Sequence, residues 1–332
     1  MRVAVLGAGA WGTALAIALA RKHDVRLWGR DAAQLASIAE TRTNAKYLPG
    51  VALDPSISVT SILADAIGDA ELALIVTSTG GLAATVISVL ETATRSSADS
   101  LPLVWACKGF NKSTGQLPHE TIAALVPADT RYGALSGPSF ADEVARGLPC
   151  ALTLASNDFA FANATAAALN GGALRVYSSA DLIGVELGGA LKNVMAIAAG
   201  ISDGMQLGLN ARAALITRGL AEMVRLGVAM GGKPETFMGL TGVGDLILTA
   251  TGNLSRNRKV GMLLAEGKSL DTILGDLGHV AEGVNSAAST LALAHRHRVS
   301  MPITEAVNAV LFQQANPRDA VKALLAREAK AE

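Results

Sequence analysis

Val3-Ala4-Val5-Leu6-Gly7-Ala8-Gly9-Ala10-Trp11-Gly12 stands at the start of the chain and decides the fold of its first half. Four apolar residues suited to a β-strand lead into G-x-G-x-x-G, and a helical pattern follows over Thr13–Arg21. The first glycine permits a tight turn, the second lets the backbone approach a pyrophosphate, and the third allows the helix to pack closely on the strand. Backbone amides at the helix start then face the anion. The motif predicts a dinucleotide site at Gly7, Gly9 and Gly12.

The residues after the second apolar run bear on the choice of cofactor. Val25–Trp28 leads into Gly29-Arg30-Asp31, close to the expected spacing from Gly12. An arginine there accommodates the 2′-phosphate of NADP, whereas a carboxylate binds the ribose 2′-hydroxyl of NAD. Arg30 therefore favours NADP(H), while NAD(H) stays possible. Asp31 is the alternative ribose ligand. The alternative for Arg30 is a solvated arginine in a turn, without a cofactor contact.

Apolar runs alternate with helical patterns through the first half of the chain. Such alternation predicts βαβ units and a mainly parallel sheet covered on both faces. From Asp181 onward only helical patterns occur, including Leu182–Ile201 and Ala211–Met230. We therefore expect an α/β, doubly wound Rossmann-type domain over 1–178 and an all-α domain over 179–332. The predicted strands are Val3–Leu6, Val25–Trp28, Leu72–Thr77, Leu103–Ala106, Tyr132–Ser136, Ala151–Ala155 and Leu174–Tyr177.

Composition excludes several classes of protein. The chain has 332 residues, 50% of them hydrophobic, with 28 basic and 28 acidic side chains. That length suits two domains, and the balanced charge gives no support for a nucleic-acid or membrane-surface partner. Two separate cysteines, Cys107 and Cys150, argue against a disulfide framework and a cysteine-rich metal site and fit a reducing cytoplasm. Val3–Ala20 is uncharged, but its strand-turn-helix pattern argues against a signal peptide or a stable membrane span.

Lys192 is the strongest candidate for acid–base chemistry. It lies with Asn193 in the apolar run L-G-G-A-L-K-N-V-M-A-I-A-A-G-I, Leu187–Ile201, which predicts a buried helix. Desolvation lowers the pKa of a lysine, as suits a proton donor or acceptor near neutral pH. Snorkelling of the side chain to the helix edge is the alternative. The sequence has no Tyr-x-x-x-Lys pattern and no Cys/His set for a catalytic zinc, and its histidines lie in polar or terminal contexts.

Other polar residues occur in apolar or glycine-rich surroundings. Lys108 in Ala106-Cys107-Lys108-Gly109 and the segment Ser136–Ala141 each follow a predicted strand, at the edge where open α/β sheets bind ligands. Gly239–Asp245 places a carboxylate at the end of what we expect to be a flexible loop. Ser255-Arg256-Asn257-Arg258-Lys259 resembles a phosphate-binding helix start, although a solvated basic turn is the alternative.

Together these motifs resemble the NAD(P)-dependent glycerol-3-phosphate dehydrogenases, in particular their bacterial biosynthetic branch. The resemblance covers nearly the whole chain and rests on G-A-G-A-W-G-T-A-L-A, N-A-K-Y-L-P-G, W-A-C-K-G, S-G-P-S-F-A, V-E-L-G-G-A-L-K-N-V, T-G-V-G-D-L-I-L-T, S-R-N-R and A-E-G. It implies reversible hydride transfer between a nicotinamide cofactor and the pair dihydroxyacetone phosphate and sn-glycerol 3-phosphate. Reduction for phospholipid synthesis is the direction it implies, and we expect a cytoplasmic homodimer.

The resemblance also implies roles for individual residues. Lys192 matches the family's proton donor and acceptor. Ala10 stands where many members have serine, which removes one hydroxyl contact to the pyrophosphate but leaves the backbone amides. Cys107 stands where threonine is frequent, and neither departure affects the reaction. The substrate contacts implied are Lys108, Gly137, Ser139, Lys192, Asp245, Ser255, Arg256 and Asn257. The cofactor contacts implied, beside the fingerprint glycines, are Ala10, Trp11, Arg30, Lys108, Ala141, Arg256, Val280 and Glu282.

Two other functions fit parts of the sequence less well. The β-hydroxyacid and 6-phosphogluconate dehydrogenases have the pattern K-x-x-x-N, with lysine and asparagine four residues apart. Here Lys192 and Asn193 are adjacent, and Ala196 stands four residues after Lys192. A dinucleotide-sensing regulator would not need Lys192, Asp245 and Arg256 together. The sequence also has no nucleic-acid motif to support a regulator.

Overall fold

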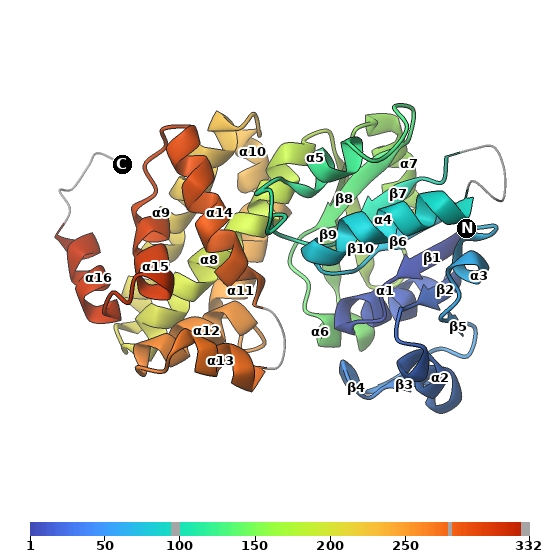
Figure 1. The fold of residues 1–332 in the computed structure, drawn as a ribbon, viewed down its shortest axis with the longest axis horizontal. Helices are drawn as coiled ribbons and strands as arrows, with labels where there is room; N and C mark the ends of the chain where they lie inside the picture. The colour runs from blue at the N-terminus through green and yellow to red at the C-terminus, as the bar shows by residue number, and fades with distance from the viewer. Residues whose placement is uncertain (94–99, 278–280, 327–332) are drawn as a thin grey trace. The chain divides into compact units, whose positions relative to one another are not determined.

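The computed structural model describes residues 1–93, 100–277 and 281–326 and divides into two compact units (Figure 1). The first unit consists of Met1–Asn111 and Gln116–Val185, and the second of Lys112–Gly115 and the chain from Glu186 onward. The functional division into a nucleotide domain, 1–178, and a substrate domain, 179–332, stays a prediction.

An eight-stranded sheet forms the centre of the first unit, in the order β10-β9-β8-β7-β6-β1-β2-β5. Along this order, all neighbouring strands between β5 and β8 pair in parallel. β9 is antiparallel to β8, and β10 is parallel to β9. The mainly parallel, doubly wound fold predicted from the sequence is confirmed. The strands are β1 (Arg2–Leu6), β2 (Asp24–Trp28), β5 (Ser58–Thr60), β6 (Leu72–Ile75), β7 (Leu103–Trp105), β8 (Tyr132–Ser136), β9 (Cys150–Ser156) and β10 (Leu174–Ser179).

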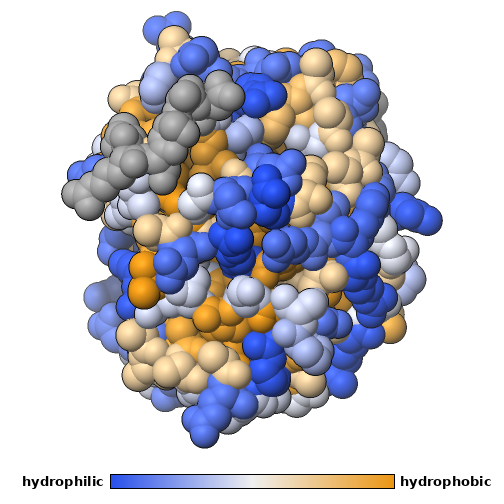
Figure 2. Space-filling view, turned by 90° about the vertical axis from the view of Figure 1, so that its right-hand side faces the viewer, coloured by the Kyte–Doolittle hydropathy of each residue, from blue (hydrophilic) through white to orange (hydrophobic). Residues whose placement is uncertain are grey.

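Both faces of this sheet are covered by helices. Val3 and Val5 of β1 belong to one apolar cluster, and Ala4 and Leu6 belong to the other, because successive side chains of a strand point to opposite faces. The first cluster includes side chains of α1 (Ala10–Ala20), α2 (Ala32–Thr41), α6 (Ala141–Ala145) and α7 (Phe159–Leu169). The second includes side chains of α3 (Leu63–Ile67), α4 (Thr79–Ala93) and α5 (Pro118–Ala123). On the face of the molecule seen in Figure 2, apolar side chains form separate patches between polar ones.

Three short strands were not predicted. β3 (Thr43–Asn44) and β4 (Leu48–Ala52) form an antiparallel pair, and β5 extends the edge of the main sheet beside β2. They lack the long apolar runs that mark the central strands, and β4 contains Pro49 and Gly50, which are uncommon in strands. The predicted strands Leu72–Thr77 and Leu103–Ala106 end earlier than expected, at Ile75 and Trp105. The apolar stretch Val3–Ala20 forms β1 and α1, as its pattern indicates.

The second unit is helical among its described residues. The long helix α8 (Leu182–Gly204) belongs to this unit from Glu186 onward, and it is buried from Gly184 to Ser202 because several helices pack against it. A side chain at Gly200 would overlap the backbone of α12, and one at Gly188 would overlap the backbone of Thr241. The other helices are α9 (Gly208–Ala229), α10 (Pro234–Phe237), η1 (Leu240–Gly244), α11 (Asp245–Thr251), α12 (Arg256–Ala265), α13 (Leu270–Leu277), α14 (Glu282–Arg296), α15 (Pro302–Phe312) and α16 (Pro317–Leu325).

By length and composition, α8 is the one described helix that could cross a membrane. In its most apolar window 89% of the residues are buried inside the protein, as in the core helix of a globular protein.

The prediction of a flexible loop over Gly239–Asp245 is wrong. Leu240–Gly244 forms a π-helical turn that continues into α11, so Asp245 is the first residue of a helix. Gly242 is needed for close approach rather than flexibility, because a side chain there would overlap the Phe237 backbone. Single π-helical turns are rare and often occur at functional sites.

A buried carboxyl group joins α9 to the start of α15. The N–H groups of Ile303 and Thr304 donate to Glu222 at 2.6 and 3.2 Å, and the Thr304 hydroxyl donates at 3.1 Å. Burial nevertheless raises the pKa of Glu222 from 4.5 to about 7, with these hydrogen bonds acting in the opposite direction.

This shift predicts a pH-dependent stability. Between pH 4.5 and about 7 the unfolded chain loses the Glu222 proton before the folded protein does, so the free energy of unfolding falls as the pH rises. The loss amounts to about 3 kcal/mol at most. Urea denaturation at several pH values should show this slope in the wild type and in the control Glu305→Gln, an exposed residue of α15. Glu222→Gln should reduce it, and an unchanged slope would show that another group is responsible.

Candidate active site

The glycine fingerprint has the geometry that a dinucleotide site needs. Gly7 adopts a φ of +131°, a backbone conformation that residues with a Cβ rarely adopt. A side chain at Gly12 would overlap the Gly7 carbonyl. At Gly9, by contrast, an added Cβ would have no neighbour within 4 Å, so the backbone is open on that side. α1 begins at Ala10, and Trp11 lies in its first turn, where N–H groups lack partners within the helix.

The two candidates at the end of β2 differ in what they contact. Asp31 is the N-cap of α2, and its Oδ1 accepts a hydrogen bond from the Gln34 N–H at 3.1 Å. Arg30 is exposed. Asp31 therefore has a structural task as a helix cap, whereas Arg30 can reach a solvent-exposed ligand.

Lys108, Gly137 and Ser139 come together after β7 and β8. The Lys108 Nζ donates to the Gly137 carbonyl at 2.8 Å, and the Ser139 hydroxyl donates to the same oxygen at 3.0 Å. Gly137 adopts a φ of +136°, and a side chain there would crowd the Ala151 carbonyl, so glycine is required. Ala141 is the first residue of α6. The sequence predicted that these residues follow strand ends, and the structure joins the first three in one hydrogen-bonded group.

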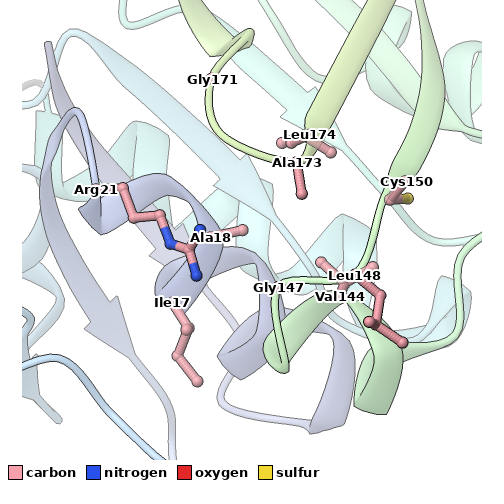
Figure 3. A pocket seen from close by; sticks show the side chains of 10 residues that line it. All are labelled: Ile17, Ala18, Arg21, Val144, Gly147, Leu148, Cys150, Gly171, Ala173 and Leu174. Carbon is pink, nitrogen blue, oxygen red and sulfur yellow. The ribbon is translucent and has the colours of Figure 1, made fainter.

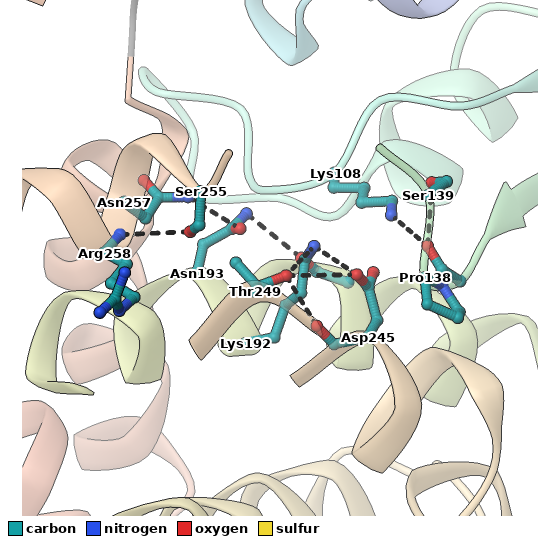
Figure 4. A network of polar contacts seen from close by, with 12 residues as sticks. Lys108, Pro138, Ser139, Lys192, Asn193, Asp245, Thr249, Ser255, Asn257 and Arg258 are labelled. Carbon is teal, nitrogen blue, oxygen red and sulfur yellow. Dashed lines mark hydrogen bonds and ion pairs between the residues drawn. The ribbon is translucent and has the colours of Figure 1, made fainter. Parts of the chain in front are cut away.

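Lys192 lies in a buried polar cluster formed by α8 and α11 (Figure 4). Its Nζ lies 2.6 Å from Asp245 Oδ1 and donates to the Thr249 hydroxyl at 2.8 Å. The side chains of Lys192 and Asp245 are 9% and 1% exposed. The snorkelling alternative is therefore wrong, since the ammonium group is held inside the unit. Burial disfavours the charged lysine, but the carboxylate beside it favours the charge.

Thr249 is a member of this cluster that the sequence reasoning missed. It lies one turn beyond Asp245 on α11, and its hydroxyl donates to the Asp245 carbonyl at 2.7 Å while it accepts from Lys192. The spacing of four residues from Asp245 was the available signal, since such residues share a helix face. This spacing is informative only within a helix, and the sequence pattern placed Asp245 at the end of a loop.

The predicted phosphate-binding group forms the start of α12. Ser255 is its N-cap and accepts from the Arg258 N–H at 3.2 Å, which leaves the hydroxyl proton available. Arg256 is the first helical residue and is exposed. Arg258 is directed elsewhere, since its guanidinium forms an ion pair with Asp203 at 2.7 Å. The basic run is thus divided between a structural ion pair and an exposed arginine at a helix N-terminus, a favourable place for an anion.

Asn257 connects three helices. Its Nδ2 donates to Asn193 Oδ1 of α8 at 2.9 Å, and its Oδ1 accepts from the Gly283 N–H of α14 at 3.0 Å. A side chain at Gly283 would crowd both Asn193 and Asn257. Glu282 is the first residue of α14. The predicted cofactor contact Val280 lies outside the described residues.

Two further observations delimit the site. A pocket in the first unit, bordered by Ile17, Arg21, Leu148 and Cys150 among others, contains none of the predicted site residues (Figure 3). Within the described parts of the chain, no group of three or more His, Cys, Asp or Glu side chains could hold a metal ion.

Comparison with known proteins identifies the family. Residues 2–162 match the model of the NAD-dependent glycerol-3-phosphate dehydrogenase N-terminus, and residues 181–322 match that of its C-terminus. The chain belongs to this family. It is an oxidoreductase with glycerol-3-phosphate dehydrogenase [NAD(P)+] activity, which excludes the two other functions weighed from the sequence.

The relatives cover the whole length of the chain. Glycerol-3-phosphate dehydrogenase [NAD(P)+] of Aromatoleum aromaticum is 55% identical over 100% of both chains. The Ralstonia nicotianae enzyme of the same name is 56% identical over 100% of this chain and 99% of its own. The crystal structure of glycerol-3-phosphate dehydrogenase from Coxiella burnetii is 40% identical, covers 98% of both chains and superposes with a TM-score of 0.91.

Proposed function

We propose that the enzyme reduces dihydroxyacetone phosphate to sn-glycerol 3-phosphate, with NADPH as the preferred cofactor and Lys192 as the proton donor. The observation that carries the proposal is the buried contact of Lys192 with Asp245 and Thr249. A buried lysine held by two polar side chains and placed in a dehydrogenase fits an acid–base group better than a solvated surface charge.

The chain's own residues fit a dinucleotide. Gly9 offers open space, and the first turn of α1 offers N–H groups of Ala10 and Trp11. Buried hydroxyls of Thr77 and Ser136, which follow or end β6 and β8, have no hydrogen-bond partner among the described residues. Buried hydroxyls are normally paired, so a ligand at the carboxyl edge of the sheet would satisfy them. We assign Gly7, Gly9, Ala10, Trp11, Gly12, Arg30, Lys108, Ala141, Arg256, Val280 and Glu282 to the cofactor.

The substrate would be bound through its phosphate and its carbonyl group. The exposed guanidinium of Arg256, the Ser255 hydroxyl and the second N–H of the Asn257 amide, at the start of α12, suit the phosphate. Lys108, Gly137 and Ser139 would contact the remainder of the substrate.

The chemistry then needs one proton at the carbonyl oxygen. The reduced nicotinamide, when bound, supplies the hydride to the carbonyl carbon. Lys192 donates its proton to the oxygen, and Asp245 holds the ammonium in place and stabilises its charge. In the reverse direction Lys192 accepts the proton of the alcohol.

The activity is tested by following NADPH oxidation with dihydroxyacetone phosphate in a spectrophotometer. Oxidation that depends on both compounds supports the proposal, and a rate no higher than background contradicts it. We further propose that the reaction supplies the backbone of phospholipids and that the enzyme acts in the cytoplasm as a homodimer, without nucleic acid or membrane insertion. Cys107 and Cys150 are not joined in a disulfide, as suits a reducing compartment.

Cofactor preference is tested by Arg30→Asp. Loss of the cation and gain of a carboxylate should lower the ratio of kcat/KM for NADPH to kcat/KM for NADH by about ten- to a hundredfold, since charged hydrogen bonds contribute about 1.5–3 kcal/mol. The exposed Arg175 of β10 provides the control Arg175→Asp. Equal ratios in the wild type and in Arg30→Asp would exclude Arg30 as the residue that selects NADPH.

A further inference from the structure

The motif N-A-K-Y-L-P-G of Asn44–Gly50 has no task in the reaction described so far. Its first residue, Asn44, is 0% exposed and lies in β3, outside the glycine fingerprint. Its Nδ2 donates to the Ala8 carbonyl at 3.0 Å and to the Thr13 hydroxyl of α1 at 2.8 Å. A distant segment thus contacts both the glycine loop and the helix that follows it.

Both the oxygen and the nitrogen of the Asn44 side-chain amide have hydrogen-bond partners. Its Oδ1 accepts from the Tyr47 N–H at 3.3 Å and from Gln34 Nε2 at 3.4 Å, and both of its N–H groups donate as described. Gln34 also donates to the Ala8 carbonyl, at 2.9 Å. The Ala8 carbonyl therefore accepts two side-chain amides, which fix its direction.

That direction matters because the Ala8 carbonyl and the Gly9 N–H belong to one peptide group. A trans peptide group is planar, so its carbonyl and its N–H point in opposite directions. With the Ala8 oxygen held by Asn44 and Gln34, the Gly9 N–H points away from both side chains. Gly9 is also the fingerprint residue whose Cβ position is open.

We propose that Asn44 is a positioning residue for cofactor binding: it holds the Ala8–Gly9 peptide so that the Gly9 N–H is directed at the pyrophosphate. The inference rests on the proposed function, since it requires a bound dinucleotide. Asn44 itself touches neither cofactor nor substrate. Thr13 completes the arrangement because its hydroxyl accepts the second N–H of the Asn44 amide.

The test is the affinity of Asn44→Leu for NADPH, measured by fluorescence titration. Leucine has a similar size but no donor, so the Ala8 carbonyl loses one of its two partners. We expect the Kd for NADPH to rise about tenfold or more, as the loss of one well-aligned hydrogen bond to an anion implies. The kcat at saturating cofactor and the KM for dihydroxyacetone phosphate should not change. Asn163→Leu, at an exposed position of α7, is the matched control.

A second pair of variants addresses folding. Thr13→Val keeps the shape of the side chain but removes the acceptor for Asn44, and should weaken NADPH binding, whereas Thr13→Ser keeps the hydroxyl and should bind as the wild type does. Adenosine 2′-monophosphate, which lacks the pyrophosphate, should inhibit all variants with the same Ki. A merely structural role would lower the melting temperature without this selectivity.

The outcomes separate the inference from the function on which it rests. If the wild type binds neither NADPH nor NADH, the proposed function fails. If the wild type binds NADPH and the folded Asn44→Leu and Thr13→Val proteins bind it equally well, only the inference is overturned. Equal weakening of NADPH and adenosine 2′-monophosphate would also overturn it, because the pyrophosphate would then not be the group that is affected.

Discussion

Lys192→Met should lower kcat by about 10²–10⁴-fold, the range that general acid–base groups typically contribute. Methionine keeps an unbranched apolar stem of similar length, so α8 can keep its packing. Neither Asp245 nor Thr249 can replace the proton that Lys192 donates, since Asp245 accepts from the ammonium and Thr249 is a neutral alcohol. Binding of dihydroxyacetone phosphate should be affected less than turnover, because the phosphate contacts are assigned to α12.

Steady-state kinetics with NADPH and dihydroxyacetone phosphate give the kcat, and a cofactor titration shows that the variant is folded. Lys268→Met introduces the same change at an exposed lysine of the second unit and should have wild-type kinetics. A decrease of only a few-fold in Lys192→Met, with cofactor binding intact, would remove Lys192 from the acid–base role.

The sequence predicted those parts of the fold whose signals are local. G-x-G-x-x-G between an apolar run and a helical pattern predicted β1 and α1, and the alternation of apolar runs predicted the central strands. β3 and β5 were missed because two- and three-residue strands are stabilised by their neighbours rather than by their own pattern. The glycines of 239–244 suggested a loop, but Leu240–Gly244 forms a π-helical turn in which Gly242 lies close to the Phe237 backbone.

The candidate site shows the same limit. Lys192 could be found from the sequence because a charge in an apolar run is conspicuous. Its contact with Asp245, 53 residues away in the chain, depends on how α8 packs against α11. Asn44 belongs to the motif N-A-K-Y-L-P-G that carries the family resemblance, but the motif by itself indicates no role for this residue, and only its contact with the Ala8 carbonyl shows a task.

Asp245→Leu should destabilise the protein by about 3–5 kcal/mol, because it leaves the buried Lys192 charge without its counterion. Lys192 is nearly inaccessible to water, so solvent cannot replace the carboxylate, and the Thr249 hydroxyl is a neutral partner only. Urea denaturation measures the free energy of unfolding. Asp271→Leu, at an exposed position of α13, is the control and should lie close to the wild type.

The double variant Lys192→Met/Asp245→Leu decides whether the effect belongs to the ion pair. Replacement of both charges by apolar side chains removes the uncompensated charge, and such replacements of buried pairs are often neutral or stabilising. The double variant should therefore regain most of the stability lost in Asp245→Leu while remaining inactive. If it is as unstable as the sum of the single variants, the two side chains act independently, and the pair does not explain the burial of Lys192. Recovery of stability without recovery of activity would show that α8 and α11 can pack without this ion pair, and that the enzyme retains it for proton transfer.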